Sequence, residues 1–171
     1  MPKPIFLIGY MGSGKTTLGK KLANRLELPF IDTDEEIVKQ IGMSITEYFG
    51  QHGEDAFRAL EREQLRKFAD STAVISTGGG APCFFDNMEW IKTNGYAVYL
   101  QMSAKALFDR LSQSKLHKRP ILIGKSPEEL RVFIEEKLTE REPYYTQAHL
   151  TIDQLNTSLE TLADLINQHN K

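Results

Sequence analysis

Short apolar runs alternate along the chain with longer stretches whose apolar residues recur every three or four positions. The first run, residues 4–8, is stopped by Gly9 and has the length and composition of a fully buried strand. Four more such runs occupy residues 29–31, 73–76, 96–100 and 149–152. Buried strands that alternate with helices form a parallel sheet covered on both faces. The pattern therefore predicts a three-layer α/β/α fold around a five-stranded parallel sheet, with ligands bound beyond the carboxyl ends of the strands.

Helical periodicity fills the segments between these strands. It covers residues 16–26, 33 to about 70, 87–93, 104–111, 128–142 and 159–166. Breaks near Gly42 and between Gly50 and Gly53 divide the second stretch. Pro143 is expected to stop the fifth helix, because a proline inside a helix removes a backbone hydrogen bond. Residues 112–126 show no clear period and predict a loop.

The composition fits a single domain over residues 1–171, which is long enough to bury a substantial core. Lys and Arg total 21 against 23 Asp and Glu, and this net charge of −2 excludes a protein that coats nucleic acid by bulk charge. The one cysteine, Cys83, cannot form an internal disulfide or a cysteine zinc site. No apolar run approaches the roughly 18–20 residues of a membrane-spanning helix. We expect a soluble cytoplasmic monomer without nucleic-acid or membrane partners.

Residues 9–16 carry the most specific motif of the chain. They read Gly-Tyr-Met-Gly-Ser-Gly-Lys-Thr and match the phosphate-loop pattern G-x-x-x-x-G-K-[ST], between a predicted strand and a predicted helix. In this pattern backbone N–H groups surround phosphate oxygens, the lysine reaches the β- and γ-phosphates, and the threonine hydroxyl can bind Mg²⁺. The alternative is a glycine-rich turn with a solvated Lys15. We predict that ATP and Mg²⁺ are bound here, by Gly12, Ser13, Gly14, Lys15, Thr16 and Thr17.

Two acidic residues follow the second predicted strand, as Asp32-Thr33-Asp34. Asp32 is placed to hold a water on the Mg²⁺ that Thr16 binds, and Asp34 to face an acceptor hydroxyl. The same residues also make a good helix start, an N-cap followed by acidic residues in the first turn, so the motif alone leaves both interpretations open. No guanine-reading N-K-x-D is present, which argues against a GTPase.

Six motifs, in their order and spacing, make the chain resemble the shikimate kinases. They are the phosphate loop, Asp32-Thr33-Asp34, Phe57-Arg58, Gly78-Gly79-Gly80, Arg119-Pro120 and Arg141-Glu142-Pro143-Tyr144. The resemblance covers almost the whole chain. It implies a nucleoside-monophosphate-kinase-like fold with an acceptor-binding helical insert at about residues 33–60 and a lid at about residues 112–126. It also implies transfer of the ATP γ-phosphoryl group to the 3-hydroxyl of shikimate, a step of chorismate and aromatic amino acid biosynthesis.

The resemblance assigns five residues to the acceptor. Arg58 and Arg141 would bind the shikimate carboxylate, for which a planar guanidinium is suited. Gly79 and Gly80 would bring backbone N–H groups close to it. Asp34 would align the 3-hydroxyl, and its role as a base is left open. By spacing alone Arg58 also fits a surface ion pair with the glutamates four residues before and three after it, and Arg141 fits a cation at a helix C-terminus.

Cations gather in the predicted loop at 112–126, which holds no acidic residue but contains Lys115, Lys118, Arg119 and Lys125. The resemblance makes Arg119 the catalytic lid arginine, which donates to the γ-phosphoryl group. It places Arg110 against the adenine ring. Without the resemblance, both would be interpreted as solvated surface residues. Asn156 is a further candidate on the adenine side, although the proline usual near it is missing.

Two other classes of function are compatible with a phosphate loop: another small-molecule kinase of the same fold, such as a gluconate or nucleotide kinase, and a non-catalytic nucleotide-binding scaffold. A gluconate kinase also binds a carboxylate, but the glycine run together with Arg119-Pro120 favours shikimate. A nucleoside monophosphate kinase is expected to carry D-G-[FY]-P-R, which is absent. A non-catalytic nucleotide-binding scaffold is disfavoured by the intact phosphate-loop, acidic and lid residues.

Overall fold

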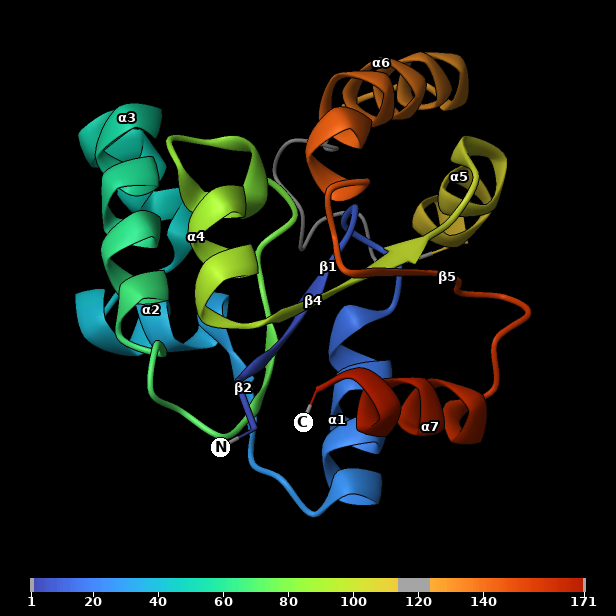
Figure 1. The fold of residues 1–171 in the computed structure, drawn as a ribbon. Coiled ribbons are helices and arrows are strands. Elements are labelled where there is room, and N and C mark those ends of the chain that lie inside the picture. Colours follow the sequence, from blue (N-terminus) through green and yellow to red (C-terminus); the bar gives the residue numbers. More distant parts are fainter. Residues whose placement is uncertain (1, 114–123, 171) are drawn as a thin grey trace.

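Five parallel strands form the centre of the molecule (Figure 1). The structure is a computed structural model that describes residues 2–113 and 124–170. The strands lie in the order β2-β3-β1-β4-β5. Their bounds are β1 (Ile5–Ile8), β2 (Phe30–Asp32), β3 (Val74–Ser76), β4 (Tyr96–Gln101) and β5 (Leu150–Asp153). The predicted five-stranded parallel sheet is confirmed.

Helices cover both faces of this sheet, as the alternation of side chains along β1 requires. Ile5 and Leu7 join a core with α1 and α7, whereas Phe6 and Ile8 join a second core with α4, α5 and α6 (Figure 1). The three-layer arrangement is therefore also confirmed. The described helices are α1 (Lys15–Leu26), α2 (Thr33–Ile41), α3 (Ile45–Arg66), η1 (Ala81–Cys83, a 3₁₀ turn), α4 (Asn87–Asn94), α5 (Ala104–Gln113), α6 (Pro127–Tyr145) and α7 (Leu159–His169).

Two glycines shape the pair of helices α2 and α3, which lie side by side (Figure 1). Gly42 ends α2 with a φ of 68°, and Gly53 kinks α3 with a φ of 82° and a ψ of 173°. Both breaks fall where the sequence predicts them. The kink lets the ring of Phe49 pack on that of Phe57, with centroids 4.7 Å apart.

One predicted boundary is wrong, because α6 does not stop at Pro143 but continues to Tyr145. The proline removes one backbone N–H, yet it lies in the last turn, and the N–H of Thr146 closes that turn on the Glu142 oxygen at 3.0 Å. Tyr145 is fully buried and packs on Tyr99 with ring centroids 5.0 Å apart. Burial of an aromatic ring outweighs the loss of one hydrogen bond.

None of the helices formed by residues 2–113 and 124–170 combines the length and the apolar character needed to cross a bilayer.

Candidate active site

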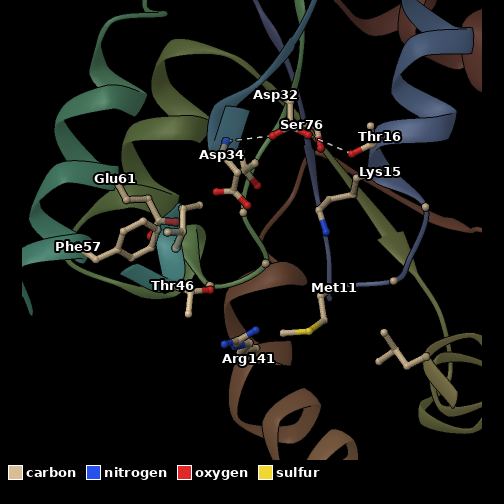
Figure 2. A pocket seen from close by; sticks show the side chains of 18 of the residues that line it. Met11, Lys15, Thr16, Asp32, Asp34, Thr46, Phe57, Glu61, Ser76 and Arg141 are labelled. Atoms are coloured by element: carbon tan, nitrogen blue, oxygen red, sulfur yellow. Dashed lines mark hydrogen bonds between the residues drawn. The ribbon is translucent and has the colours of Figure 1, made fainter. Parts of the chain in front are cut away.

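A cavity of about 610 Å³ opens where β1, β2 and β3 end (Figure 2). Its walls are the phosphate loop, the start of α2, the kinked part of α3, the glycine run after β3, two residues near the end of α5 and one near the end of α6. Parallel strands place all their carboxyl ends on one edge, so the segments that follow them meet there. Figure 2 shows Lys15, Asp34 and Arg141 around this space.

The phosphate loop is shaped by glycines in conformations that other residues rarely adopt. Gly9, Gly12 and Gly14 have φ values of 150°, 81° and 86°. Gly14 caps α1, so the positive end of this helix faces the loop. The Lys15 side chain is buried and donates to the backbone oxygens of Gly9 at 2.7 Å and Tyr10 at 3.0 Å. Lys15 therefore lies across the loop, and the interpretation of a solvated lysine is wrong.

Asp32 forms the N-cap that the sequence allows, and it also contacts the phosphate loop. Its Oδ1 accepts hydrogen bonds from the N–H groups of Asp34 at 3.0 Å and Glu35 at 3.3 Å, which caps α2. Its Oδ2 accepts a hydrogen bond from the Thr16 hydroxyl at 3.1 Å. The cap thus orients the carboxylate towards the phosphate loop. A hydroxyl and a carboxylate oxygen placed side by side are ligands of the kind that Mg²⁺ prefers.

Asp34 and Glu61 approach each other across Gly78. A Cβ on Gly78 would lie 2.9 Å from Asp34 Oδ1 and 3.0 Å from Glu61 Oε2, so any larger residue there would displace a carboxyl. Burial and, next, the neighbouring Asp32 carboxylate raise the pKa of Asp34 to about 6 against the pull of nearby cations. Burial raises the pKa of Glu61 to about 7, although Arg58 opposes it. The cavity thus contains two carboxyls that titrate near neutral pH.

Arg58 forms a buried wall of the cavity. It is 9% exposed, and it donates to Glu61 at 2.9 Å and to Glu54 at 3.4 Å. Its guanidinium lies 4.1 Å from the centre of the Phe84 ring, and a Cβ on Gly80 would come within 2.7 Å of its Nη1. The ion pairs expected from spacing are confirmed, but the interpretation of a surface pair is wrong.

Arg141 faces the same glycine run from α6. A Cβ on Gly79 would lie 3.4 Å from its Nη1, and its guanidinium lies over the ring of Tyr10 at 5.5 Å. Because α6 continues past Pro143, Arg141 is not in the last turn of the helix, so the interpretation of a C-terminal cation is wrong. Two guanidinium groups and a side-chain-free backbone turn thus surround one part of the cavity, an arrangement suited to a carboxylate.

The predicted adenine side is only partly assembled around the phosphate loop. Arg110 is exposed, lines the cavity and donates to the Gly12 oxygen at 3.2 Å. A Cβ on Gly14 would lie 2.9 Å from Arg110 Nη1 and 2.8 Å from Gln154 Nε2. Asn156 instead lines a second cavity of about 520 Å³. Gln154, rather than Asn156, therefore lies beside the loop.

The predicted lid is described only at its edges. Helix α5 extends to Gln113, two residues into the predicted loop, and Lys125 lies with its ammonium 4.7 Å from the centre of the Phe133 ring. Arg119 and the prediction made for it lie outside the described residues.

Three residues in or next to the site are not singled out by sequence reasoning: Glu61, which lines the cavity, and Gln154 and Tyr145, which lie beside it. Glu61 stands one helical turn after Arg58, and that spacing signals an ion pair but not burial. Gln154 has no local signal beyond its position after the last strand. Tyr145 lies beyond the proline that local rules treat as a helix end.

Comparison with known proteins decides the family. A family model described as shikimate kinase matches residues 11–170. The chain belongs to the shikimate kinase family. A shikimate kinase of Parabacteroides distasonis is 50% identical over 152 residues, which are 88% of this chain and 87% of that relative.

Solved structures of the shikimate kinase family share the fold over the whole chain. A shikimate kinase from Bacteroides thetaiotaomicron has a TM-score of 0.89 at 43% identity, covering 98% of both chains. One from Acinetobacter baumannii, in complex with shikimate, has a TM-score of 0.84 at 35% identity, covering 98% of this chain and 92% of that chain.

Proposed function

We propose that this protein is a shikimate kinase, which transfers the γ-phosphoryl group of ATP to the 3-hydroxyl of shikimate and releases ADP and shikimate 3-phosphate. One observation carries the proposal. A phosphate loop and a two-arginine wall meet in a single cavity, with Asp34 between them. Family membership and the shikimate complex of the Acinetobacter baumannii relative support shikimate as the acceptor.

The phosphate loop would bind the nucleotide through its backbone N–H groups and the N-terminus of α1. Lys15, which starts that helix, would donate to the β- and γ-phosphate oxygens. Arg110 lies close to Gly14 and can place its guanidinium on the adenine ring, with Gln154 beside it. Arg119 remains a predicted donor to the transferred group, on the evidence of the sequence alone.

We propose Thr16 and Asp32 as the residues that hold Mg²⁺. The 3.1 Å contact between their oxygens at the phosphate loop supports this assignment. Bound there, Mg²⁺ would supply positive charge that offsets the charge of the phosphates during transfer. The protein's own part is to orient the Asp32 carboxylate, which the capping of α2 achieves.

Arg58, Arg141 and the glycine run would hold the shikimate carboxylate, and this contact would fix the ring. Asp34 would then accept a hydrogen bond from the 3-hydroxyl and direct its oxygen towards the γ-phosphorus. With a pKa of about 6, Asp34 is ionised at neutral pH and is a stronger proton acceptor than an ordinary aspartate. A loose transition state demands little of a base, so alignment is the main contribution of Asp34.

We further propose that the enzyme works as a cytoplasmic monomer, with residues 33–60 as the acceptor-binding insert and 112–126 as the lid. The use of ATP as a substrate supports a cytoplasmic location. Sedimentation across the concentrations used in the assay checks the monomer, and specific activity should not change with concentration.

The first experiment measures ADP release from MgATP with shikimate, gluconate, a nucleoside monophosphate or no acceptor. We expect a rate that depends on shikimate and far exceeds the others, and equal rates with every acceptor would contradict the proposal. Arg58→Ala should raise KM for shikimate about 10-fold or more and leave KM for ATP unchanged, because it removes a charged donor to the carboxylate. Arg62→Ala is the matched control, one turn along α3, with an exposed side chain paired with Asp86.

A further inference from the structure

Gly78, Gly79 and Gly80 form a backbone turn that no side chain of its own can hold in place. Glycine populates a wide range of φ and ψ, so the peptide groups of such a run are free to rotate unless something outside the run fixes them. The acceptor site depends on the direction of these peptides, because their N–H groups are the candidate donors. Tyr145 contacts this turn from behind.

We propose that the Tyr145 hydroxyl is a positioning group that fixes the Gly79–Gly80 peptide for binding of the acceptor carboxylate. The proposal rests on the proposed function, and it adds a residue that does not itself line the cavity. Tyr145 acts through the groups that it holds.

One hydrogen bond joins the phenol to the glycine turn. The Tyr145 O–H donates to the Gly79 carbonyl at 2.5 Å. Arg141, one turn earlier on α6, lies near enough for its charge to act on the phenol. The hydroxyl thus holds the glycine turn beside one cationic residue of the site.

Because a peptide group is planar, the hydrogen bond to its C=O also fixes the direction of its N–H group. The Gly79–Gly80 peptide is trans, so its C=O and N–H groups point in opposite directions. Tying the Gly79 carbonyl to buried Tyr145 therefore turns the Gly80 N–H away from the tyrosine. Gly80 lines the cavity, and a Cβ on it would meet Arg58, so the peptide that Tyr145 holds lies at the arginine wall of the cavity.

Packing alone does not explain the hydroxyl. The Tyr145 ring is fully buried against Tyr99, and a phenylalanine would fill the same space. Tyr99 provides the comparison within the same cluster. It is equally buried, but its hydroxyl donates to Glu142 at 2.7 Å and not to the glycine turn.

The test compares Tyr145→Phe with the matched control Tyr99→Phe. Each variant deletes one buried hydroxyl from the same aromatic pair, so both should lower the melting temperature. Only Tyr145→Phe should raise KM and the calorimetric Kd for shikimate, by about 5- to 30-fold, the effect of one buried hydrogen bond. Its kcat and KM for ATP should stay within about twofold of wild type, because the carboxylate is bound alike in ground and transition states.

A second measurement needs no substrate. The backbone amide signal of Gly80 in ¹H–¹⁵N spectra should shift or broaden in Tyr145→Phe and stay in place in Tyr99→Phe. The proposal is overturned if Tyr145→Phe keeps the shikimate affinity and the Gly80 signal of wild type, or if Tyr99→Phe changes both equally. If wild type shows no rate with shikimate, the proposed function fails, and the amide signal still decides whether Tyr145 fixes the turn.

Discussion

The fold shields the carboxyls of Asp34 and Glu61 from solvent, although an ionised carboxylate is more stable in water. Both carboxyls lie against Gly78, Glu61 buried and Asp34 partly exposed to the cavity, and burial raises their pKa values to about 6 for Asp34 and about 7 for Glu61. A solvent-exposed aspartate would not cost the protein this stability, but its carboxylate would be a weaker proton acceptor. A stability cost at such positions is typical of functional sites.

This cost should be measurable in Asp34→Asn. The folded protein raises the Asp34 pKa from 3.8 to about 6, so it binds this proton more tightly than the unfolded chain. The penalty is therefore absent below about pH 4, grows between pH 4 and 6, and is complete above pH 6. We expect Asp34→Asn to melt at a higher temperature than wild type at pH 8, by about 2–4 °C per kcal/mol recovered, and to lose this gain near pH 4. A gain that does not change with pH would refute the assignment.

The same pKa predicts how activity responds to acid. With shikimate as acceptor, kcat/KM should fall as the pH drops through about 6, because protonated Asp34 cannot accept the hydrogen bond from the 3-hydroxyl. Steady-state rates between pH 5 and 8.5 would show this, with kcat of Asp34→Asn reduced by about 10²-fold or more. Glu61→Gln is the control and should retain the acidic fall. If Glu61→Gln lost the fall in kcat/KM at acid pH, the group that titrates would be Glu61 and not Asp34.

At the scale of elements, local sequence patterns predict the strands and helix breaks that interactions between nearby residues determine. The five strands and the breaks at Gly42 and Gly53 are confirmed, because composition and glycine conformation act within a few residues. The edge strands β2 and β5 are only partly buried, however, and not fully buried as expected. The end of α6 is mispredicted because burial of Tyr145 is a tertiary effect that overrides the proline rule. Similarly, no local signal could show that Gln154, and not Asn156, lies beside the phosphate loop. Spacing along the sequence does not indicate which residues far apart in the chain lie next to each other.

The kink in α3 offers a test of element geometry. Gly42 and Gly53 both have open space where a Cβ would be, so Ala at either position meets no other atom. Gly42 lies in the left-handed helical region, where other residues cost about 1–2 kcal/mol, whereas Gly53 has a φ of 82° and a ψ of 173°, which is essentially a glycine conformation. Gly53→Ala should therefore lose more unfolding free energy in urea than Gly42→Ala. It should also raise KM for shikimate, because the kink sets Phe57 and Arg58. Equal losses in both variants would indicate that the kink is not fixed by backbone conformation.

At the scale of the whole molecule, the site exists because parallel topology gathers segments that are distant in sequence. The phosphate loop, the start of α2 and the glycine run follow three strands that are neighbours in the sheet, and α6 closes the remaining side. The sequence predicts the sheet and most members of the site, since each motif follows a predicted strand. It does not predict how deeply Arg58 is buried, or that Glu61 shares its space, because both depend on how α3 packs across the sheet edge.

The two cores should unfold together, because β1 contributes alternate side chains to each. Leu7 is fully buried in the core that includes α1 and α7, whereas Trp90, the single tryptophan, packs on Phe6 and the opposite core. Leu7→Ala should cost about 2–5 kcal/mol, as large-to-small substitutions in cores do. If the chain is one cooperative unit, Trp90 fluorescence and far-ultraviolet circular dichroism should report the same lowered urea midpoint. Leu155→Ala, at an exposed leucine, is the control and should leave the midpoint nearly unchanged. Separate midpoints for the two probes in Leu7→Ala would show that the faces unfold independently, and the prediction of a single domain would fail.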